Sequence, residues 1–230
     1  MNAIVTGATK GIGKAIVELL AQQGFNVAFC ARTAADVEAF QEELQANYQG
    51  EFVGKTVDMS DKQAVKDFGA AIKQQWKEVD ILVNNAGVFI PCPLTEGDTE
   101  EAFETMINLN LYSAYYLTQA ILPLMLQQQK GHVFNMCSIA SIMPYGAYAV
   151  SKHALLGFSR VLREEVKDKG VRVTAVLPGA TYTASWDGTD LPQERFMKAE
   201  DIAQSLWDIY KLSQQTVVEE IILRPQLGDI

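Results

Sequence analysis

Short apolar segments rich in β-branched residues alternate with segments of helical periodicity along this chain of 230 residues. The apolar segments span residues 2–6, 26–30, 51–57, 80–84, 131–137, 171–177 and 218–223. Between them, apolar residues recur at the spacing of one helix face, as at Ile16, Leu19 and Leu20. Parallel strands need a long crossover between them, which is usually a helix. The alternation therefore predicts an α/β fold with one doubly wound domain over residues 1–230, a seven-stranded parallel sheet and helices on both faces.

Local signals predict where some of these elements end. Gly24 follows the first helical segment, in the position where a glycine commonly ends a helix. Ser60 and Gln63 precede the third helical segment at the spacing of a capping box. Residues 180–198 break the alternation with a polar segment rich in turn residues. Long loops in compact domains are usually functional, so we expect 180–198 to form a lid over a substrate.

Composition excludes several classes of function. The net charge of −9 opposes binding to nucleic acid or to an anionic membrane surface. No apolar run reaches the roughly 18 residues of a membrane span, and the first residues lack the pattern of a secretory leader, so we expect a cytoplasmic protein. Cys30, Cys92 and Cys137 are far apart in apolar surroundings and are expected to be buried, reduced packing residues. With only His132 and His153 and no paired spacing, no metal site is predicted.

A glycine-rich turn follows the first predicted strand, in the run TGATKGIG at residues 6–13, and a helical segment begins at once. Glycines allow a tight turn and a close approach to a pyrophosphate, while the helix N-terminus offers free N–H groups. The spacing GxxxGxG differs from the common dinucleotide motif GxGxxG. The turn predicts a Rossmann-type cofactor site, with contacts from Gly7, Thr9, Lys10, Gly11, Ile12 and Gly13.

The end of the second predicted strand indicates which nucleotide binds. An NAD site places a carboxylate there to bind the ribose 2′-hydroxyl. This chain has Arg32 followed by Thr33, and Lys10 adds a second cation from the glycine-rich turn. A guanidinium pairs with a phosphate instead, so the sequence predicts NADP(H) as cofactor.

Together these motifs resemble the short-chain dehydrogenases/reductases of the compact one-domain kind. The resemblance spans nearly the whole chain. In order along the sequence it rests on the turn at 6–13, Asp58, the run NNAG at 84–87, Asn110, Ser138, Tyr148 with Lys152, Pro178-Gly179 and Thr183. It implies an oxidoreductase that moves a hydride between the nicotinamide and a carbonyl or alcohol carbon of a small substrate.

The resemblance also implies the catalytic residues. Tyr148 would give a proton to the carbonyl oxygen in reduction and take it back in oxidation. Lys152 lies one helical turn further on, so its ammonium shares a face with the phenol, can stabilise the phenolate and can bind the nicotinamide ribose. Ser138 would hold the substrate oxygen near Tyr148. Asn110 would hold a water that links Lys152 to solvent.

Further cofactor contacts are implied in the same way. Asp58 after the third strand suits a hydrogen bond to the adenine amino group, and the backbone of residues 84–87 would lie against the adenosine ribose. The chain near Pro178 would pass under the nicotinamide, and Thr183 would meet its carboxamide. The complete set implied in these regions is Thr33, Asp58, Met59, Asn84, Asn85, Ala86, Gly87, Pro178, Gly179, Thr181 and Thr183, in addition to Tyr148 and Lys152.

One departure from the family concerns the step from Ser138 to Tyr148, which is shorter than in most relatives. This short step leaves open which serine faces the substrate oxygen, with Ser138 favoured and Ser141 as the alternative. Tyr145 is a weaker candidate than Tyr148, because the residue four positions after it is Ala149 and no lysine.

Several functions remain open within and beyond this family. The alternatives among enzymes are a 3-oxoacyl-acyl-carrier-protein reductase, a sepiapterin-like reductase and a general carbonyl reductase. A small free carbonyl is favoured, because acyl carrier protein is acidic and this chain is acidic too. Nucleotide-sugar epimerases usually carry an additional substrate domain. A non-catalytic NADPH-sensing regulator is the alternative from another class, but the full set of catalytic residues favours an enzyme. The apolar run around Tyr112, Tyr115 and Tyr116 predicts a homodimer or homotetramer.

Overall fold

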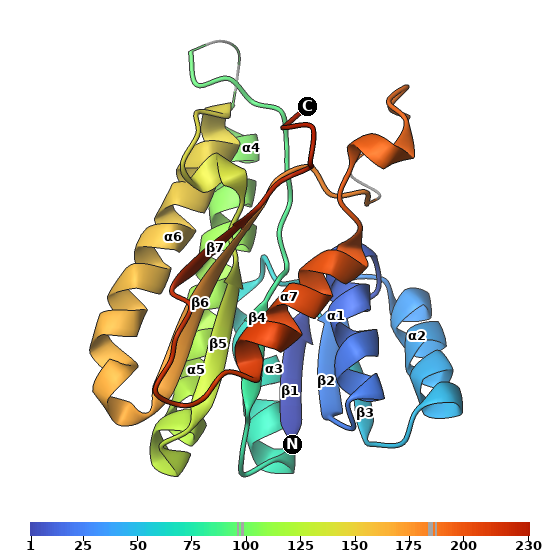
Figure 1. Cartoon of the computed structure of the whole chain (residues 1–230), viewed down its shortest axis with the longest axis vertical. Helices are drawn as coiled ribbons and strands as arrows, with labels where there is room; N and C mark the ends of the chain where they lie inside the picture. The colour runs from blue at the N-terminus through green and yellow to red at the C-terminus, as the bar shows by residue number, and fades with distance from the viewer. Residues whose placement is uncertain (96, 98, 184–185, 187) are drawn as a thin grey trace.

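Seven parallel strands form one sheet in residues 1–95, 97, 99–183, 186 and 188–230, the part of the chain that the computed structural model describes (Figure 1). The strands are β1 (Asn2–Thr6), β2 (Asn26–Ala31), β3 (Phe52–Thr56), β4 (Ile81–Asn84), β5 (Gly131–Met136), β6 (Val171–Pro178) and β7 (Glu220–Leu223). Their order is β3-β2-β1-β4-β5-β6-β7. The chain therefore reverses its direction of winding between β1 and β4, where doubly wound sheets form their ligand crevice.

The strand positions confirm the predicted fold class. Each strand falls on one predicted apolar segment, although β2 and β6 each extend one residue past it, to Ala31 and Pro178, and every pair of neighbouring strands is parallel. The largest difference lies at the last segment, where pairing with β6 begins at Glu220 and the predicted strand begins at residue 218. A strand starts where its ladder hydrogen bonds start, and the apolar pattern alone does not locate that point.

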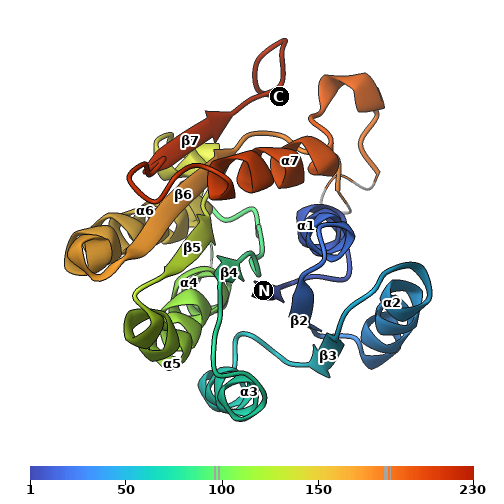
Figure 2. The same cartoon turned by 60° about the horizontal axis from the view of Figure 1, so that its bottom comes forward.

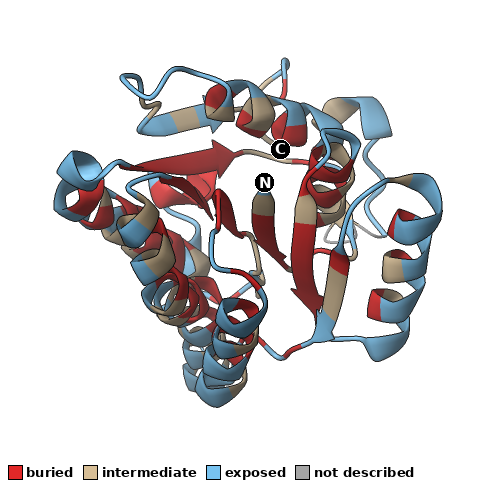
Figure 3. Cartoon of the chain, turned by 90° about the horizontal axis from the view of Figure 1, so that it is seen from below, coloured by how far each residue is buried: buried red, intermediate tan, exposed pale blue. Residues whose placement is uncertain are grey.

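Helices cover both faces of the sheet (Figure 2). They are α1 (Gly11–Gln22), α2 (Ala34–Asn47), α3 (Lys62–Gln75), α4 (Glu100–Ile107), α5 (Ser113–Gln128), α6 (Gly146–Val166) and α7 (Ala199–Tyr210). Side chains alternate along a strand, so Ala3 and Val5 pack with α1, α2 and α7, while Ile4 packs with α3, α5 and α6. The inner strands are buried, the edge strands β3 and β7 are partly exposed, and the outer faces of the helices are exposed (Figure 3).

One predicted helix cap is correct and another is wrong. Gly24 has a φ of +80° after α1, as expected for a residue that ends a helix. The N-cap of α3 is Asp61, whose Oδ1 accepts hydrogen bonds from the N–H groups of Gln63 at 2.6 Å and Ala64 at 3.0 Å. The proposed cap, Ser60, instead donates its hydroxyl to Asp58 Oδ1 at 2.7 Å. The carboxylate of Asp61 is also favoured at the positive end of the helix dipole, so it takes the capping position.

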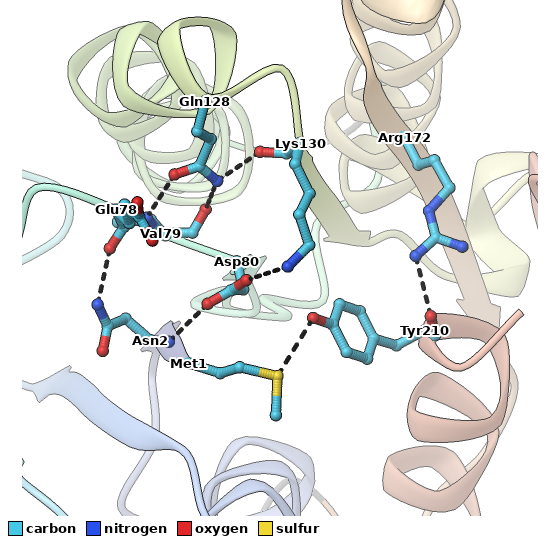
Figure 4. Close-up of polar contacts among 9 residues, drawn as sticks. All are labelled: Met1, Asn2, Glu78, Val79, Asp80, Gln128, Lys130, Arg172 and Tyr210. Carbon is cyan, nitrogen blue, oxygen red and sulfur yellow. Dashed lines mark hydrogen bonds and ion pairs between the residues drawn. The ribbon is translucent and has the colours of Figure 1, made fainter. Parts of the chain in front are cut away.

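A polar network closes the amino edge of the sheet, opposite the carboxyl ends of the strands (Figure 4). The Asp80 carboxylate accepts a hydrogen bond from Asn2 N at 2.9 Å and pairs with Lys130 Nζ at 2.8 Å. Gln128 donates to Val79 O at 2.6 Å and accepts from Val79 N at 3.2 Å. These contacts tie β1, β4 and β5 together at one end and leave the other end of the sheet for loops.

His132 on β5 is fully buried, and its neighbours define its tautomer. Its Nε2 lies 2.8 Å from the hydroxyl of Thr174, which itself donates to Val218 O at 2.6 Å. Nε2 must therefore donate, which leaves Nδ1 as an unprotonated atom without a partner in the described part of the chain. Burial, followed by the charge of Arg172, holds the pKa of His132 well below its usual value.

The cysteines are free and buried, as predicted. Burial raises the pKa of Cys30 to about 12 and that of Cys137 to about 11, so both thiols stay protonated and unreactive at neutral pH. No helix in the described residues combines the length and apolar character that a membrane span needs.

Candidate active site

A cavity of about 590 Å³ lies at the carboxyl ends of the strands, where the glycine-rich turn after β1 meets the loop after β4. These ends point upward in Figure 1, where the segment after β6 also lies. The predicted residues that line the cavity are Gly7, Thr9, Lys10, Gly11, Ile12, Gly13, Arg32, Thr33, Met59, Asn85, Ala86, Gly87, Ser138, Tyr148, Lys152, Pro178, Gly179, Thr181 and Thr183. Residues predicted from separate motifs therefore converge on one space.

The glycine-rich turn forms a cradle whose backbone packs too closely to admit a side chain at Gly13. Gly7 has a φ of +64°, a conformation that favours glycine. A Cβ at Gly13 would lie 2.2 Å from Gly7 O and 2.6 Å from Asn85 Nδ2. That amide group of Asn85 donates to Thr6 O at 2.9 Å and Gly7 O at 3.0 Å, which fixes the turn. The conformation of the cradle is therefore fixed by contacts with the loop after β4.

The first turn of α1 faces this cradle. Its N-cap residue, Lys10, makes no side-chain capping bond in the described residues, in contrast to Asp61 at the start of α3. The N–H groups of Gly11 and Ile12 are thus available to an anion, and the helix dipole favours one there. Thr183 lies against the same turn, since a Cβ at Gly11 would be 2.9 Å from its Cγ2.

Charged side chains line the end of the cavity formed by β2 and α2. Arg32 makes no ion pair within the described part of the chain. Lys10 pairs with Asp36 at 3.0 Å, and Asp36 also lines the cavity. Asp36 is not among the residues predicted from the sequence, because it meets Lys10 only once β1 and β2 have paired.

Asp58, the predicted adenine contact, lies outside the residues that line the cavity. Its Oδ1 accepts from Ser60 N at 2.9 Å as well as from the Ser60 hydroxyl. These hydrogen bonds are the main reason that its pKa is lowered, with a smaller contribution from the charge of Arg32.

Tyr148 and Lys152 project from α6 at the other end of the cavity. Lys152 is 4% exposed, and its Nζ lies 5.8 Å from the centre of the Tyr148 ring. The same Nζ donates to Met136 O at 2.8 Å, at the end of β5. This bond holds the ammonium beside the phenol, in the relation that the i, i+4 spacing predicts.

Ser138 follows β5 and caps a 3₁₀ turn (Ile139–Ser141). Its Oγ accepts from Ala140 N at 3.1 Å, and the residue lines the cavity. Ser141, the alternative to Ser138, is 1% exposed and donates its hydroxyl to Lys152 O at 2.9 Å. The short connection thus places Ser138 in the cavity wall and turns Ser141 toward the helix behind it.

Asn110 lies behind the cavity wall in a π-helical turn (Asn108–Tyr112) between α4 and α5. Its Oδ1 accepts from Val88 N at 2.7 Å, and its Nδ2 donates to Val88 O at 3.0 Å and Ser151 Oγ at 2.9 Å. A Cβ at Gly87 would lie 3.1 Å from Asn110 Oδ1 and 3.3 Å from Lys152 Nζ. The amide therefore fixes the loop after β4 close to Lys152.

Asn84 also lies outside the residues that line the cavity. Its Nδ2 donates to Thr118 Oγ1 at 3.0 Å and Asn135 Oδ1 at 2.8 Å. It therefore ties β4 to α5 and β5 and supports the loop that carries Asn85, Ala86 and Gly87.

Other residues of the cavity have no counterpart in the predicted set. They include Asp36, Val88, Phe89, Ile139, Ala140, Tyr145, Trp186, Asp229 and Ile230. The Phe89 ring is 5.0 Å from that of Tyr148, and half of Phe89 is exposed. Phe89 could have been predicted as a cavity residue, because it follows closely on the run at 84–87. Nothing in the sequence places Asp229 near Gly179.

Part of the predicted lid at 180–198 borders the cavity. Thr181 pairs with Met197, and the Trp186 ring is 4.9 Å from that of Phe196. Residues 184, 185 and 187 lie outside the described part of the chain. In that part, no group of three or more His, Cys, Asp or Glu side chains is placed to hold a metal ion.

Comparison with known proteins agrees with this arrangement. Residues 1–193 match the family described as short chain dehydrogenase. A sepiapterin reductase from Chlorobaculum tepidum is 37% identical over 239 residues, with 99% of this chain and 97% of that protein covered.

Two solved structures share the fold over nearly the whole chain. An alcohol dehydrogenase from the archaeon Thermococcus sibiricus, in complex with 5-hydroxy-NADP, is 29% identical with a TM-score of 0.89, covering 100% of this chain and 98% of that one. A metagenomic short-chain oxidoreductase in complex with NADP is 31% identical with a TM-score of 0.85, covering 99% and 98%. The chain therefore belongs to the short-chain dehydrogenase family, whose members are oxidoreductases.

Proposed function

We propose that this protein is an NADP(H)-dependent reductase of small carbonyl compounds, with Tyr148 as the acid that protonates the carbonyl oxygen. The observation that carries the proposal is one cavity with a glycine cradle and the cations Arg32 and Lys10 at one end and Tyr148, Lys152 and Ser138 at the other. Such a cavity suits a long anionic cofactor that reaches a proton donor.

The residues at the cradle fit the cofactor. The tight turn that requires a glycine at position 13 and the uncapped first turn of α1 suit a pyrophosphate. Arg32, which has no ion pair in the described residues, suits the 2′-phosphate of NADP(H). Complexes of the two structural relatives with NADP and a modified NADP support the same choice.

The bound nicotinamide would supply the hydride, and the side chains of this chain would handle the proton and the substrate oxygen. Ser138 Oγ already accepts a hydrogen bond from Ala140 N, so its own proton can be donated to that oxygen. Tyr148 would donate its proton to the same atom. Lys152, held by Met136 O, would stabilise the phenolate that remains.

Reprotonation of Tyr148 requires a path to solvent. By the family resemblance, a water beside Asn110 would connect Lys152 to solvent. The Asn110 amide is bonded to the Val88 backbone and Ser151, so we propose that it acts by fixing the loop on which that water would sit.

A small free carbonyl is the proposed substrate class. Phe89, Tyr145 and Trp186 give the cavity an aromatic lining, with the Phe89 ring 5.0 Å from that of Tyr148, and these three side chains offer no cation for an anionic carrier. The net charge of −9 also opposes docking of acyl carrier protein. The similarity to a sepiapterin reductase makes a pterin with a side-chain ketone a specific candidate.

A panel of carbonyl compounds tests this proposal. Short ketones, diketones, quinones, pterins and acetoacetyl thioesters would each be incubated with NADPH, and its oxidation followed by absorbance. We expect turnover of at least one small free carbonyl, faster than turnover of the acetoacetyl thioester. Binding of NADPH without oxidation by any compound would favour the sensing regulator, and a preference for the thioester would favour the reductase of fatty-acid synthesis.

We also propose a symmetric dimer or tetramer. Tyr112 and Tyr115 are 43% and 41% exposed, and their rings pack on Tyr116 to form an aromatic surface over the start of α5. On α6, whose Phe158 ring lies 6.1 Å from that of Tyr115, Val161 is 59% exposed. Exposed apolar surface on neighbouring helices is typical of a contact between subunits.

A further inference from the structure

The ion pair between Lys10 and Asp36 occupies the proposed 2′-phosphate site. Lys10 Nζ and Asp36 Oδ2 are 3.0 Å apart, and both residues line the cavity beside Arg32. Asp36 lies in the first turn of α2, where the helix dipole favours a carboxylate. Its side chain is 34% exposed, against 68% for that of Lys10. The aspartate is thus the better anchored member of the pair.

The pair lowers the positive charge available to a phosphate. Lys10 and Arg32 contribute two positive charges to this wall, and Asp36 removes one of them. A phosphate monoester carries a charge of about −1.5 to −2 at neutral pH. Asp58, the next carboxylate beside Arg32, has one oxygen bonded to Ser60 and adds more negative charge nearby. The net positive charge that the site offers to a phosphate is therefore smaller than the sum of its two cations.

We propose that Asp36 is a specificity-determining residue that weakens binding of the 2′-phosphate of NADP(H) by holding the ammonium of Lys10. The inference rests on the proposed NADP(H) preference. For Lys10 to bind the phosphate it must leave Asp36, and the Asp36 carboxylate then faces another anion. The 2′-phosphate of NADP(H) is bound mainly through Arg32. The affinity of the protein for NADP(H) therefore exceeds that for NAD(H) by less than the two cations alone would give.

The test replaces the carboxylate without changing its shape. Asp36→Asn keeps the size of the side chain and frees Lys10. Glu43→Gln is the matched control, because it removes the same charge from the same helix but breaks a pair with Lys14, which does not line the cavity. Binding would be measured by calorimetry with 2′,5′-ADP and 5′-AMP, which differ only in the 2′-phosphate, and with NADPH and NADH.

A freed ammonium that gains a charge-assisted hydrogen bond should tighten binding of 2′,5′-ADP and NADPH by about 5- to 30-fold. Binding of 5′-AMP and NADH should change by less than about 2-fold, since neither carries the phosphate that Lys10 would bind. Glu43→Gln should leave all four affinities within about 2-fold. In a Lys10→Met background, Asp36→Asn should tighten binding of 2′,5′-ADP and NADPH by less than about 3-fold, because the ammonium that it frees is absent.

Two other results would overturn the proposal in different ways. If the wild-type protein prefers NADPH and Asp36→Asn leaves 2′,5′-ADP binding unchanged or weaker, Asp36 does not oppose the phosphate and the cofactor assignment stands. If neither the wild type nor Asp36→Asn binds NADPH more tightly than NADH, the cofactor assignment fails and the role of Asp36 fails with it.

Discussion

Replacement of Asn110 by alanine should destabilise the protein, because its side-chain amide makes three hydrogen bonds inside the protein. The change removes the acceptor for Val88 N and the donors to Val88 O and Ser151 Oγ. Asn110 is 1% exposed, so water cannot replace it without rearrangement. Each buried polar group left without a partner costs about 1–3 kcal/mol, and with Val88 only partly buried the total should be about 3 kcal/mol. For a chain of this length that corresponds to a fall in Tm of about 6–12 °C.

Chemical and thermal denaturation followed by circular dichroism would measure this loss. Asn108→Ala is the matched control, because Asn108 lies in the same π-helical turn and is exposed. It should change the free energy of unfolding by less than about 0.5 kcal/mol. An Asn110→Ala protein as stable as the control would show that the amide does not hold the loop after β4.

Three further predictions concern the cofactor, pH and assembly. Arg32→Asp should weaken NADPH more than NADH by about 1–3 kcal/mol, measured by fluorescence titration, and wild-type protein that binds NADH at least as tightly as NADPH would contradict the assignment. The pKa of His132 is lower in the folded than in the unfolded chain, so the unfolded state binds more protons and stability should fall as pH drops below about 6.5, by up to about 1.4 kcal/mol per pH unit. Urea denaturation should show this slope in wild type and in a variant of the exposed His153, His153→Gln, but a smaller slope in His132→Gln; equal slopes in all three would rule out His132 as the source. Sedimentation at micromolar concentration should show a dimer or tetramer, and a single species of 25.4 kDa would be incompatible with the proposed subunit contact.

The fold could be predicted from the sequence because its signals are local. The strands have continuous apolar runs since both faces of a parallel sheet are buried, and Gly7 and Gly13 mark a turn that only glycines can form. Tyr148 and Lys152 share a helix face by spacing alone. Each of these inferences needs only neighbours along the chain.

The remaining features depend on contacts between distant segments. Lys10 and Asp36 meet only after β1 and β2 pair, and Asp229 reaches Gly179 only through the pairing of β7 with β6. The hydrogen bonds of Asn110 to Val88 likewise join different elements. At the start of α3, several neighbouring polar residues could cap the helix. The Ser60 hydroxyl donates to Asp58, and Asp61 is the residue that accepts from the first turn of the helix.

Turnover of Tyr148→Phe on the best substrate from the carbonyl panel tests the central claim most directly. The variant removes one hydroxyl and keeps the ring that packs on Phe89. NADPH affinity should therefore survive, while turnover should fall by about 10²–10⁴-fold, the usual contribution of general acid catalysis. Lys152→Met should lower turnover and NADPH affinity together, and Tyr145→Phe should leave turnover close to wild type. If Tyr148→Phe kept most of its activity while Tyr145→Phe lost it, the assignment of Tyr148 as the proton donor would be wrong.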